Sequence, residues 1–258
     1  MKLSVRKKLL LAFTSTILTS ILITCVVLGL QIRDSAIATF HDSTSKELGQ
    51  IDRAVGIFVD KALKMTTMIA TSPLVQAADE SVHSYVNETR PLSPKDITRS
   101  DVERDMVAFF KLINTTHPEY VEVFIGTKWG GFSSSGESEM PPGYDPRKRP
   151  WYTKAMETPD KASISPAYMS TTGEAVISNM FPITTKDGQI IGCSGLDVGL
   201  GVLTDLIKKS PMGTTGYVIL VQDDGTILAN PRHEDFNFKK MQETGVPALA
   251  QLGSIAED

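Results

Sequence analysis

Residues 143–152 read GYDPRKRPWY, with three basic residues and two prolines around three aromatic ones. One interpretation is a solvated basic loop followed by two core aromatics. The other is a carboxylate-binding loop, because a guanidinium binds a carboxylate through two parallel hydrogen bonds and indole and phenol groups add donors. Arg149, Trp151 and Tyr152 are the candidates for such a cradle. The prolines would stiffen the loop before binding and reduce the ordering cost.

A ligand that also carries an ammonium group needs an acceptor, and Asp197 is the candidate. It ends an otherwise apolar strand predicted over residues 190–198. A lone buried carboxylate is costly there without a cationic partner. Spacing alone favours the alternatives, in which Asp197 caps the following helix or pairs with a protein cation. Tyr168, between two predicted strands, is equally ambiguous, and Phe124 and Thr172 are guesses at the wall that would read a ligand side chain.

Around this loop the hydrophobic period is two, which predicts strands. A hairpin is expected over 120–126 and 131–134, and a second over 175–183 and 189–198, with Lys186-Asp187-Gly188 in its turn. The glycine-rich segment 192–201 is interpreted as close backbone packing in a strand. A helix over 200–209 precedes strands at 216–221 and 226–229, with a turn at 223–225. The pattern predicts an α+β fold with an antiparallel sheet.

The segment before the first hairpin reads as helical. Residues 31–70 carry apolar residues three and four apart, which places them in one stripe: Leu48, Ile51, Val55, Phe58, Ala62, Met65 and Ile69. A core-facing stripe is favoured over a dimer seam, although a parallel coiled coil also fits. Ser72-Pro73 breaks this helix, 74–88 is expected to resume a shorter one, and Ser100 is expected to cap a helix that ends near Asn114.

Leu9 to Leu30 is an uncharged, proline-free run of 22 residues. At 1.5 Å per residue it is about 33 Å long, enough to cross a bilayer core. A cleaved signal peptide usually has a shorter apolar core, so an uncleaved anchor is favoured. The basic residues before the run predict a cytoplasmic N-terminus and place everything after residue 33 outside the inner membrane.

The composition limits the function classes. The net charge is −4, and residues 1–30 hold four basic groups and no acid, which leaves 22 basic and 30 acidic residues in the remainder. An acidic body argues against nucleic-acid binding. The two cysteines, Cys25 and Cys193, are not expected to pair, and the four histidines show no metal spacing. No metal or cofactor is expected. Enzyme motifs are missing from the sequence, so a binding module is favoured over an enzyme.

The loop at 143–152, together with GLDV at 195–198, resembles the double Cache sensor domains of bacterial chemoreceptors, in particular the amino-acid-binding type. The resemblance implies that Arg149 and Trp151 hold a ligand carboxylate, with Tyr152 assisting. It implies that Tyr144 and Asp197 hold the ammonium, and it places Tyr168 near a further pocket tyrosine.

The resemblance also implies PAS-like antiparallel sheets and a domain plan. The plan has a cytoplasmic segment 1–8, a transmembrane helix 9–30, a stalk helix 31–70, a membrane-distal ligand-binding module 71–209 and the start of a membrane-proximal module at 210–258. A homodimer and a periplasmic sensor of a chemotaxis transducer are expected. A sensor histidine kinase or diguanylate cyclase could carry the same front end, and an anchored adaptor without a small ligand is the third possibility.

Overall fold

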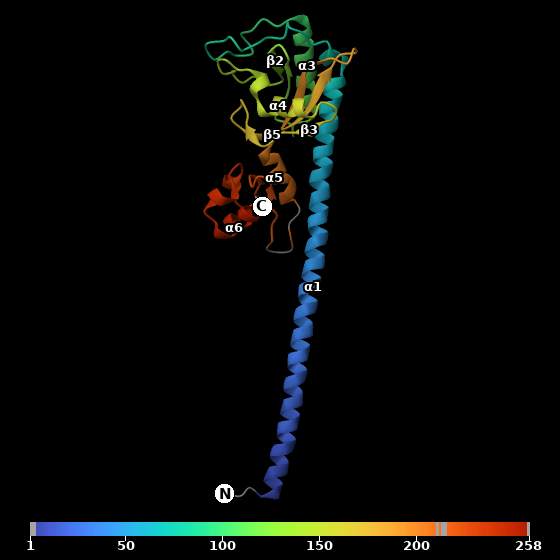
Figure 1. The fold of residues 1–258 in the computed structure, drawn as a ribbon, viewed down its shortest axis with the longest axis vertical. Coiled ribbons are helices and arrows are strands. Elements are labelled where there is room, and N and C mark those ends of the chain that lie inside the picture. Colours follow the sequence, from blue (N-terminus) through green and yellow to red (C-terminus); the bar gives the residue numbers. More distant parts are fainter. Residues whose placement is uncertain (1–3, 210–211, 213–215, 257–258) are drawn as a thin grey trace. The chain divides into compact units, whose positions relative to one another are not determined.

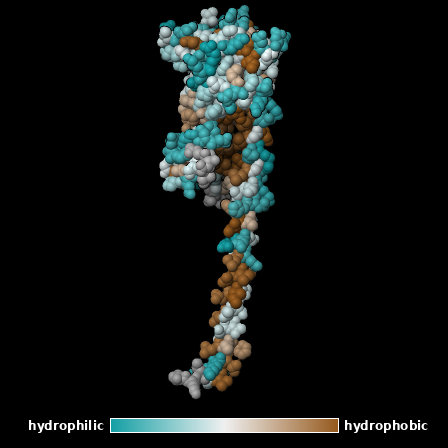
Figure 2. Space-filling view, viewed as in Figure 1, coloured by the Kyte–Doolittle hydropathy of each residue, from teal (hydrophilic) through white to brown (hydrophobic). Residues whose placement is uncertain are grey.

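The computed structural model describes residues 4–209, 212 and 216–256, and it divides the chain into two compact units, residues 1–50 and 51–258. The helix α1 (Val5–Thr71) begins in the first unit and ends in the second. Its most apolar 18-residue stretch has a mean hydropathy of 2.2, and none of that stretch is buried. Apolar side chains cover the N-terminal part of α1 (Figure 2). By length and composition alone, this helix could cross a membrane.

An antiparallel sheet forms the centre of the second unit, with strand order β2-β1-β6-β5-β3 and with β4 paired to β5 (Figure 1). The strands are β1 (Glu122–Thr127), β2 (Phe132–Ser134), β3 (Ser163–Ile164), β4 (Tyr168–Met169), β5 (Ala175–Thr184) and β6 (Ile190–Gly199). The predicted hairpins are therefore confirmed as β1–β2 and β5–β6, while β3 and β4 were not predicted.

Each side of the sheet has its own core, because successive residues of a strand face opposite sides. On β1, Val123 and Ile125 belong to one apolar cluster and Phe124 to the other. The first core includes residues of α1 and of α3 (Asp101–Thr116), and the second includes residues of α4 (Pro150–Glu157). Since both sides are covered, β1 is buried along its whole length.

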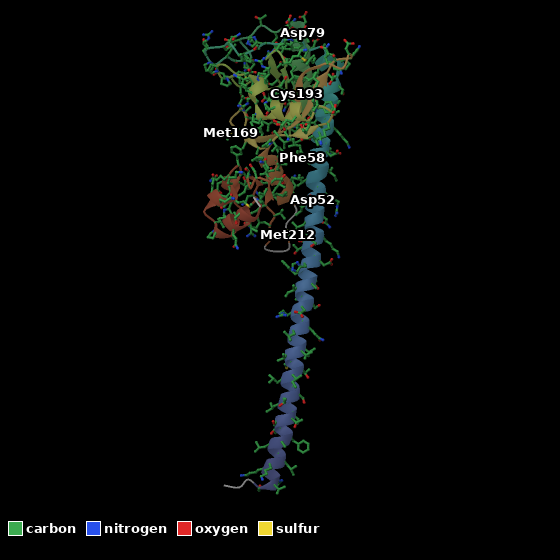
Figure 3. All side chains as sticks on the ribbon, viewed as in Figure 1. Asp52, Phe58, Asp79, Met169, Cys193 and Met212 are labelled. Atoms are coloured by element: carbon green, nitrogen blue, oxygen red, sulfur yellow. The ribbon has the colours of Figure 1, made fainter. Side chains whose placement is uncertain are left out.

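The part of α1 from Ile51 onward packs on the sheet, which confirms the core-facing interpretation of its stripe. Phe58 lies on the packed side (Figure 3), and Ile51, Ala62 and Ile69 are buried, whereas Leu48 is exposed. Thr66 links the helix to two strands. Its hydroxyl donates to the carbonyl oxygen of Asn179 at 3.3 Å, and its carbonyl oxygen accepts from the Ser194 hydroxyl at 3.2 Å.

The connection between α1 and α3 differs from the prediction of a helix over 74–88. Only one turn forms there, α2 (Pro73–Gln76). The Asp79 carboxylate then accepts the Ser81 amide at 2.9 Å, a local bond that competes with helix formation. Farther on, Ser84 makes an isolated bridge to Gly131. The Ser100 cap of α3 is confirmed, since its hydroxyl accepts the Glu103 amide at 3.1 Å.

The C-terminal segment follows the predicted helix, α5 (Leu200–Lys208). It contains β7 (Leu220–Val221), β8 (Ile227–Ala229), the 3-10 turns η2 (Glu234–Phe236) and η3 (Met241–Thr244), and α6 (Pro247–Ala256). The predicted turn at 223–225 is confirmed, with Gly225 at a φ of 81° and its amide donating to Gln222. The strands expected at 216–221 and 226–229 are shorter than predicted, and their pairing has a register shift between Leu220 and Val221. Residues 213–215, beside the first of these strands, lie outside the described part.

Candidate ligand-binding site

One row of side chains crosses three neighbouring strands on the side of the sheet that α4 covers. Glu122 on β1 is the register partner of Asp197 on β6, and Asp197 is the partner of Ser178 on β5. The three residues expose 4%, 1% and 0% of their surface. The antiparallel register thus brings together two carboxyl groups that are far apart in the sequence.

Asp197 is held by hydroxyl groups and not by a cation. The Ser178 hydroxyl donates to it at 2.5 Å, and the Tyr168 hydroxyl lies 3.3 Å and 3.4 Å from its two oxygens. Burial raises the pKa of Asp197 well above its usual range, Ser178, Tyr168 and Arg149 oppose that shift, and the carboxyl group of Glu122 adds to it. Asp197 makes no salt bridge within the described ranges of the chain.

The two structural alternatives for Asp197 therefore do not hold. The residue at the N-cap of α5 is Gly199, which makes no side-chain capping bond. Asp197 is 1% exposed and has no cationic partner, so ionising its carboxyl group would destabilise the folded protein. A cationic group on a bound ligand would offset that cost.

Glu122 is a second buried carboxyl group at the same place. Burial raises its pKa, and hydrogen bonds from the Ser134 hydroxyl and the Gly136 amide oppose the shift. The backbone at Gly136 passes so close that a Cβ there would overlap the Glu122 carboxyl. Glycine at this position lets the turn after β2 donate to the carboxylate directly.

Arg149 reaches this row from the loop before α4. It is the N-cap residue of α4, and Pro150 fixes the first turn after it, as expected for proline at a helix start. One guanidinium nitrogen, Nη2, donates to the Met169 carbonyl at 3.1 Å. The Nε atom is buried and has no hydrogen-bond partner among the residues that the structure describes. The guanidinium lies 5.8 Å from the Tyr144 ring centre and 5.5 Å from that of Tyr168.

Aromatic rings form the remaining wall. Trp151 is 1% exposed, and its ring centre lies 4.8 Å from that of Phe124; Phe132 lies 4.9 Å from Tyr144. Two glycines in the strands make room for these rings. A Cβ on Gly126 would lie 2.6 Å from the Trp151 indole, and a Cβ on Gly195 would overlap the ring of Phe124. The predicted close packing of the glycine-rich segment 192–201 is confirmed at Gly195.

These groups line a narrow cavity. Its lining residues are Glu122, Phe124, Phe132, Tyr144, Arg149, Trp151, Tyr168, Ser170, Thr171 and Asp197. The cavity volume is about 10 Å³, which is the space for roughly one water molecule. A larger ligand therefore requires side chains such as Arg149 to move, and the lining offers it two carboxyl groups and a guanidinium.

Five of the six residues singled out in the sequence line this cavity, and Tyr152 does not. Tyr152 is buried on α4, with its ring centre 5.7 Å from that of Trp151. Of the two wall candidates, Phe124 lines the cavity and Thr172 does not, although its neighbour Thr171 does. Sequence reasoning missed Glu122. The available signal was a charged residue inside a strand, two positions before Phe124 and therefore on the same side.

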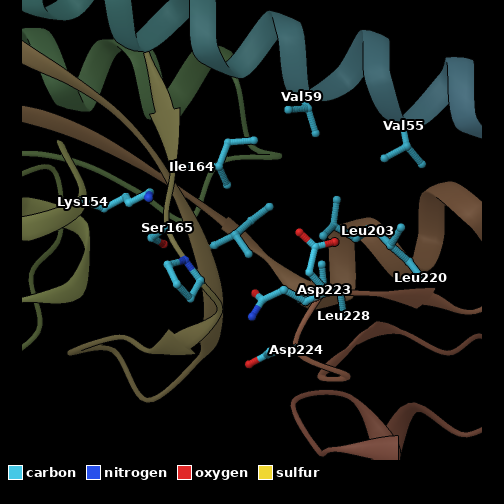
Figure 4. A pocket seen from close by; sticks show the side chains of 13 residues that line it. Val55, Val59, Lys154, Ile164, Ser165, Leu203, Leu220, Asp223, Asp224 and Leu228 are labelled. Atoms are coloured by element: carbon cyan, nitrogen blue, oxygen red, sulfur yellow. The ribbon is translucent and has the colours of Figure 1, made fainter. Parts of the chain in front are cut away.

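A larger, apolar cavity of about 430 Å³ lies near α1 and α5 (Figure 4). Its walls include Val55, Val59, Ile164, Leu203 and Leu228, with Asp223 and Asp224 also among its lining residues. Lys154, Ser165 and Gln222 are its other polar lining residues, but its exposed lining is mainly apolar. The smaller cavity carries the convergent charged groups that identify a binding site, and we regard it as the candidate.

Known proteins share this architecture. The methyl-accepting chemotaxis protein McpG of Pseudomonas putida is 36% identical over 118 residues, which are 46% of this chain and 18% of that protein. The chain thus corresponds to a small part of the curated relatives that it matches. The ligand-binding domain of the Campylobacter jejuni chemoreceptor Tlp3, solved with L-valine, has a TM-score of 0.60 at 21% identity and covers 83% of this chain and 78% of that one.

A similar fold occurs in the extracellular domain assigned to a histidine kinase, mmHK1S-Z3. Its TM-score is 0.57 at 15% identity, with 80% of this chain and 79% of that chain covered. The family model described as a Cache domain matches residues 30–257, which is most of the chain. The chain therefore belongs to the Cache domain family.

Proposed function

We propose that this chain is the sensor part of a chemotaxis receptor and that its small cavity binds an amino acid as a zwitterion. The observation that carries this proposal is the pairing of charges in one cavity: Asp197 is buried without a salt bridge to any described residue, and Arg149, whose Nε atom is buried without a hydrogen-bond partner among the described residues, lines the same cavity. The ammonium group of an amino acid would pair with the Asp197 carboxylate, and its carboxylate would pair with the Arg149 guanidinium.

The proposed roles follow from this geometry. Arg149 binds the ligand carboxylate, and the Trp151 indole, whose N–H is hydrogen-bonded to Tyr144, forms part of the same cavity wall. Asp197 accepts the ligand ammonium, while Tyr168 holds the carboxylate of Asp197 in place. Tyr144 closes the site with its ring under the Arg149 guanidinium. Tyr152 is assigned no contact with the ligand.

A route for signalling is part of the proposal. Ser178 on β5 and Asp197 on β6 hydrogen-bond to each other on the side of the sheet that holds the cavity. The same two strands contact α1: Thr66 donates to the carbonyl oxygen of Asn179 on β5 and accepts from the Ser194 hydroxyl on β6. A ligand that shifts these strands therefore acts directly on the helix that carries the apolar segment. We propose that α1 anchors the receptor, that residues after 33 lie outside the cell membrane, and that two copies pair.

The proposed domain plan keeps the boundaries expected from the sequence: segment 1–8, a transmembrane helix 9–30, a stalk 31–70, a ligand-binding module 71–209 and a second module that starts at 210. A chemotaxis output is favoured because the curated relatives are methyl-accepting chemotaxis proteins. The mmHK1S-Z3 likeness supports a sensor kinase as the second candidate.

The test is a binding screen on the full chain in lipid nanodiscs. The twenty amino acids are added one at a time, and the melting temperature is recorded. At 100 times its dissociation constant a ligand adds about 2.7 kcal/mol to the free energy of unfolding, a shift of several degrees. At least one amino acid should stabilise the wild type and not Arg149→Ala. A cooperatively melting sample that responds to no amino acid contradicts the proposal.

The output is tested separately in the organism that encodes the protein. Loss of swimming toward or away from the identified ligand in an Arg149→Ala strain, with an unrelated response intact, supports the chemotaxis role. An unchanged swimming response together with a ligand-dependent change in protein phosphorylation supports the kinase.

A further inference from the structure

The cavity holds one carboxyl group more than a simple zwitterion requires. An α-amino acid has one ammonium for Asp197 and one carboxylate for Arg149. Glu122 is left over, buried at 4% exposure and without a salt bridge among the described residues. If both carboxyl groups ionise when a ligand binds, two carboxylates and one guanidinium give the lining a charge of −1, and a ligand of charge +1 balances it.

We propose, building on the amino-acid site proposed above, that the preferred ligands are amino acids with a second cationic group and that Glu122 binds that group. Glu122 and Asp197 are direct cross-strand partners. Side chains in that relation have Cβ atoms about 5 Å apart, so two cations on one short chain can reach both carboxylates.

The Glu122 carboxylate has unused acceptor positions for such a contact. A carboxylate offers about four acceptor positions, and only the Ser134 hydroxyl and the Gly136 amide are assigned to it. The rings of Phe124 and Phe132 lie along the same cavity. Aromatic rings accept the methylene stem of a lysine-like side chain and also attract its charge.

The alternative is a structural role, in which Glu122 only fixes the turn after β2. The substitution Glu122→Gln separates the two roles. The glutamine carbonyl still accepts the Ser134 and Gly136 hydrogen bonds, while the negative charge is removed. A purely structural role predicts no change in the order of ligand affinities.

The experiment measures the affinity of the full chain in nanodiscs for L-lysine, L-ornithine, L-glutamine and L-norleucine by calorimetry. L-norleucine has a similar stem to lysine without the terminal ammonium. We expect lysine or ornithine to bind about tenfold or more tightly than norleucine, because a charge-assisted hydrogen bond is lost in the latter. In Glu122→Gln this preference should fall to about twofold or less.

A proton count gives an independent readout. If the two adjacent carboxyl groups share a proton in the empty site, an amino acid with two ammonium groups releases it on binding, and an amino acid with one ammonium group does not. Calorimetry in buffers of different ionisation enthalpy should therefore report more proton release with lysine than with norleucine.

The possible failures are distinguishable. Equal affinities for lysine, glutamine and norleucine, with no effect of Glu122→Gln, overturn the role of Glu122 and leave the amino-acid site standing. Binding of no amino acid to the wild type overturns the site itself. Cadaverine is a diamine without a carboxylate, so it should bind more weakly than lysine. If cadaverine binds as tightly as lysine, the proposal that the preferred ligand is an amino acid is overturned.

Discussion

Glu122 on β1 and Asp197 on β6 are direct cross-strand partners, and both residues are buried. They line the same cavity as Arg149. Two neighbouring carboxyl groups in a dry environment resist double ionisation, since each negative charge disfavours the other. Arg149 offsets only one of the two charges. The empty site therefore favours protonation of one carboxyl group, and a cationic group on a ligand would stabilise both groups in their ionised form.

Arg149→Ala should weaken ligand binding by about 2–4 kcal/mol, because the carboxylate of the ligand loses its charged partner. The matched control is Lys148→Ala, which removes a neighbouring exposed positive charge that does not line the cavity. Titration calorimetry with the best ligand from the screen measures both variants. Equal losses in the two variants would mean that Arg149 acts through the overall charge of the loop.

Tyr168→Phe should lower the affinity by about 1 kcal/mol, because its hydroxyl bonds to Asp197 and to Ser178 at 2.8 Å. Tyr152→Phe is the matched control, since Tyr152 lies one side chain away from the cavity. It should leave the dissociation constant within about twofold. A larger effect of Tyr152→Phe than of Tyr168→Phe would restore the role that the sequence motif implied for Tyr152.

The unliganded protein should become more stable as the pH falls from above the folded-state pKa values of Asp197 and Glu122 toward their unfolded-state values. The folded-state pKa values of Asp197 and Glu122 are raised, by burial above all. Between the unfolded-state pKa values of about 4 and the raised folded values, the folded chain binds more protons than the unfolded chain. The free energy of unfolding therefore decreases as pH rises through that window, by up to about 1.4 kcal/mol per pH unit for one proton.

Asp197→Asn isolates that pH effect. The variant keeps a side chain of the same shape but cannot ionise, so its melting temperature should depend less on pH above the unfolded-state pKa of about 4. Urea unfolding at several pH values gives the slopes for wild type and variant. Parallel slopes would show that Asp197 has the same pKa in both states.

Gly195→Ala should destabilise the fold by about 1–3 kcal/mol, because the new methyl group overlaps the Phe124 ring in a packed core. Gly56→Ala provides the opposite case. A Cβ there meets no atom within 4 Å, and the position lies inside α1, so alanine should stabilise by up to about 1 kcal/mol. Chemical denaturation measures both. Since Phe124 also lines the cavity, a folded Gly195→Ala protein that binds ligand normally would argue against Phe124 as a wall of the site.

Some of the site was predictable because it is local. Arg149 and Trp151 stand two positions apart around Pro150, and that spacing survives folding because proline fixes the helix start. Tyr152 could not be assigned in the same way. Consecutive residues on a helix point about 100° apart, so when Trp151 faces the cavity, Tyr152 faces elsewhere. Which of the two would face inward depended on how α4 packs on the sheet.

The sequence by itself determined the features that depend on short-range patterns: the apolar helix, the stripe from Ile51, the Ser100 cap and the two hairpins with their glycine turns. The tertiary structure alone decided what long-range pairing controls. It ended the helix after Gln76, and it set Glu122 opposite Asp197. Strand register joins residues that are distant in the chain, and a shift of one position would have turned Glu122 to the other side of the sheet.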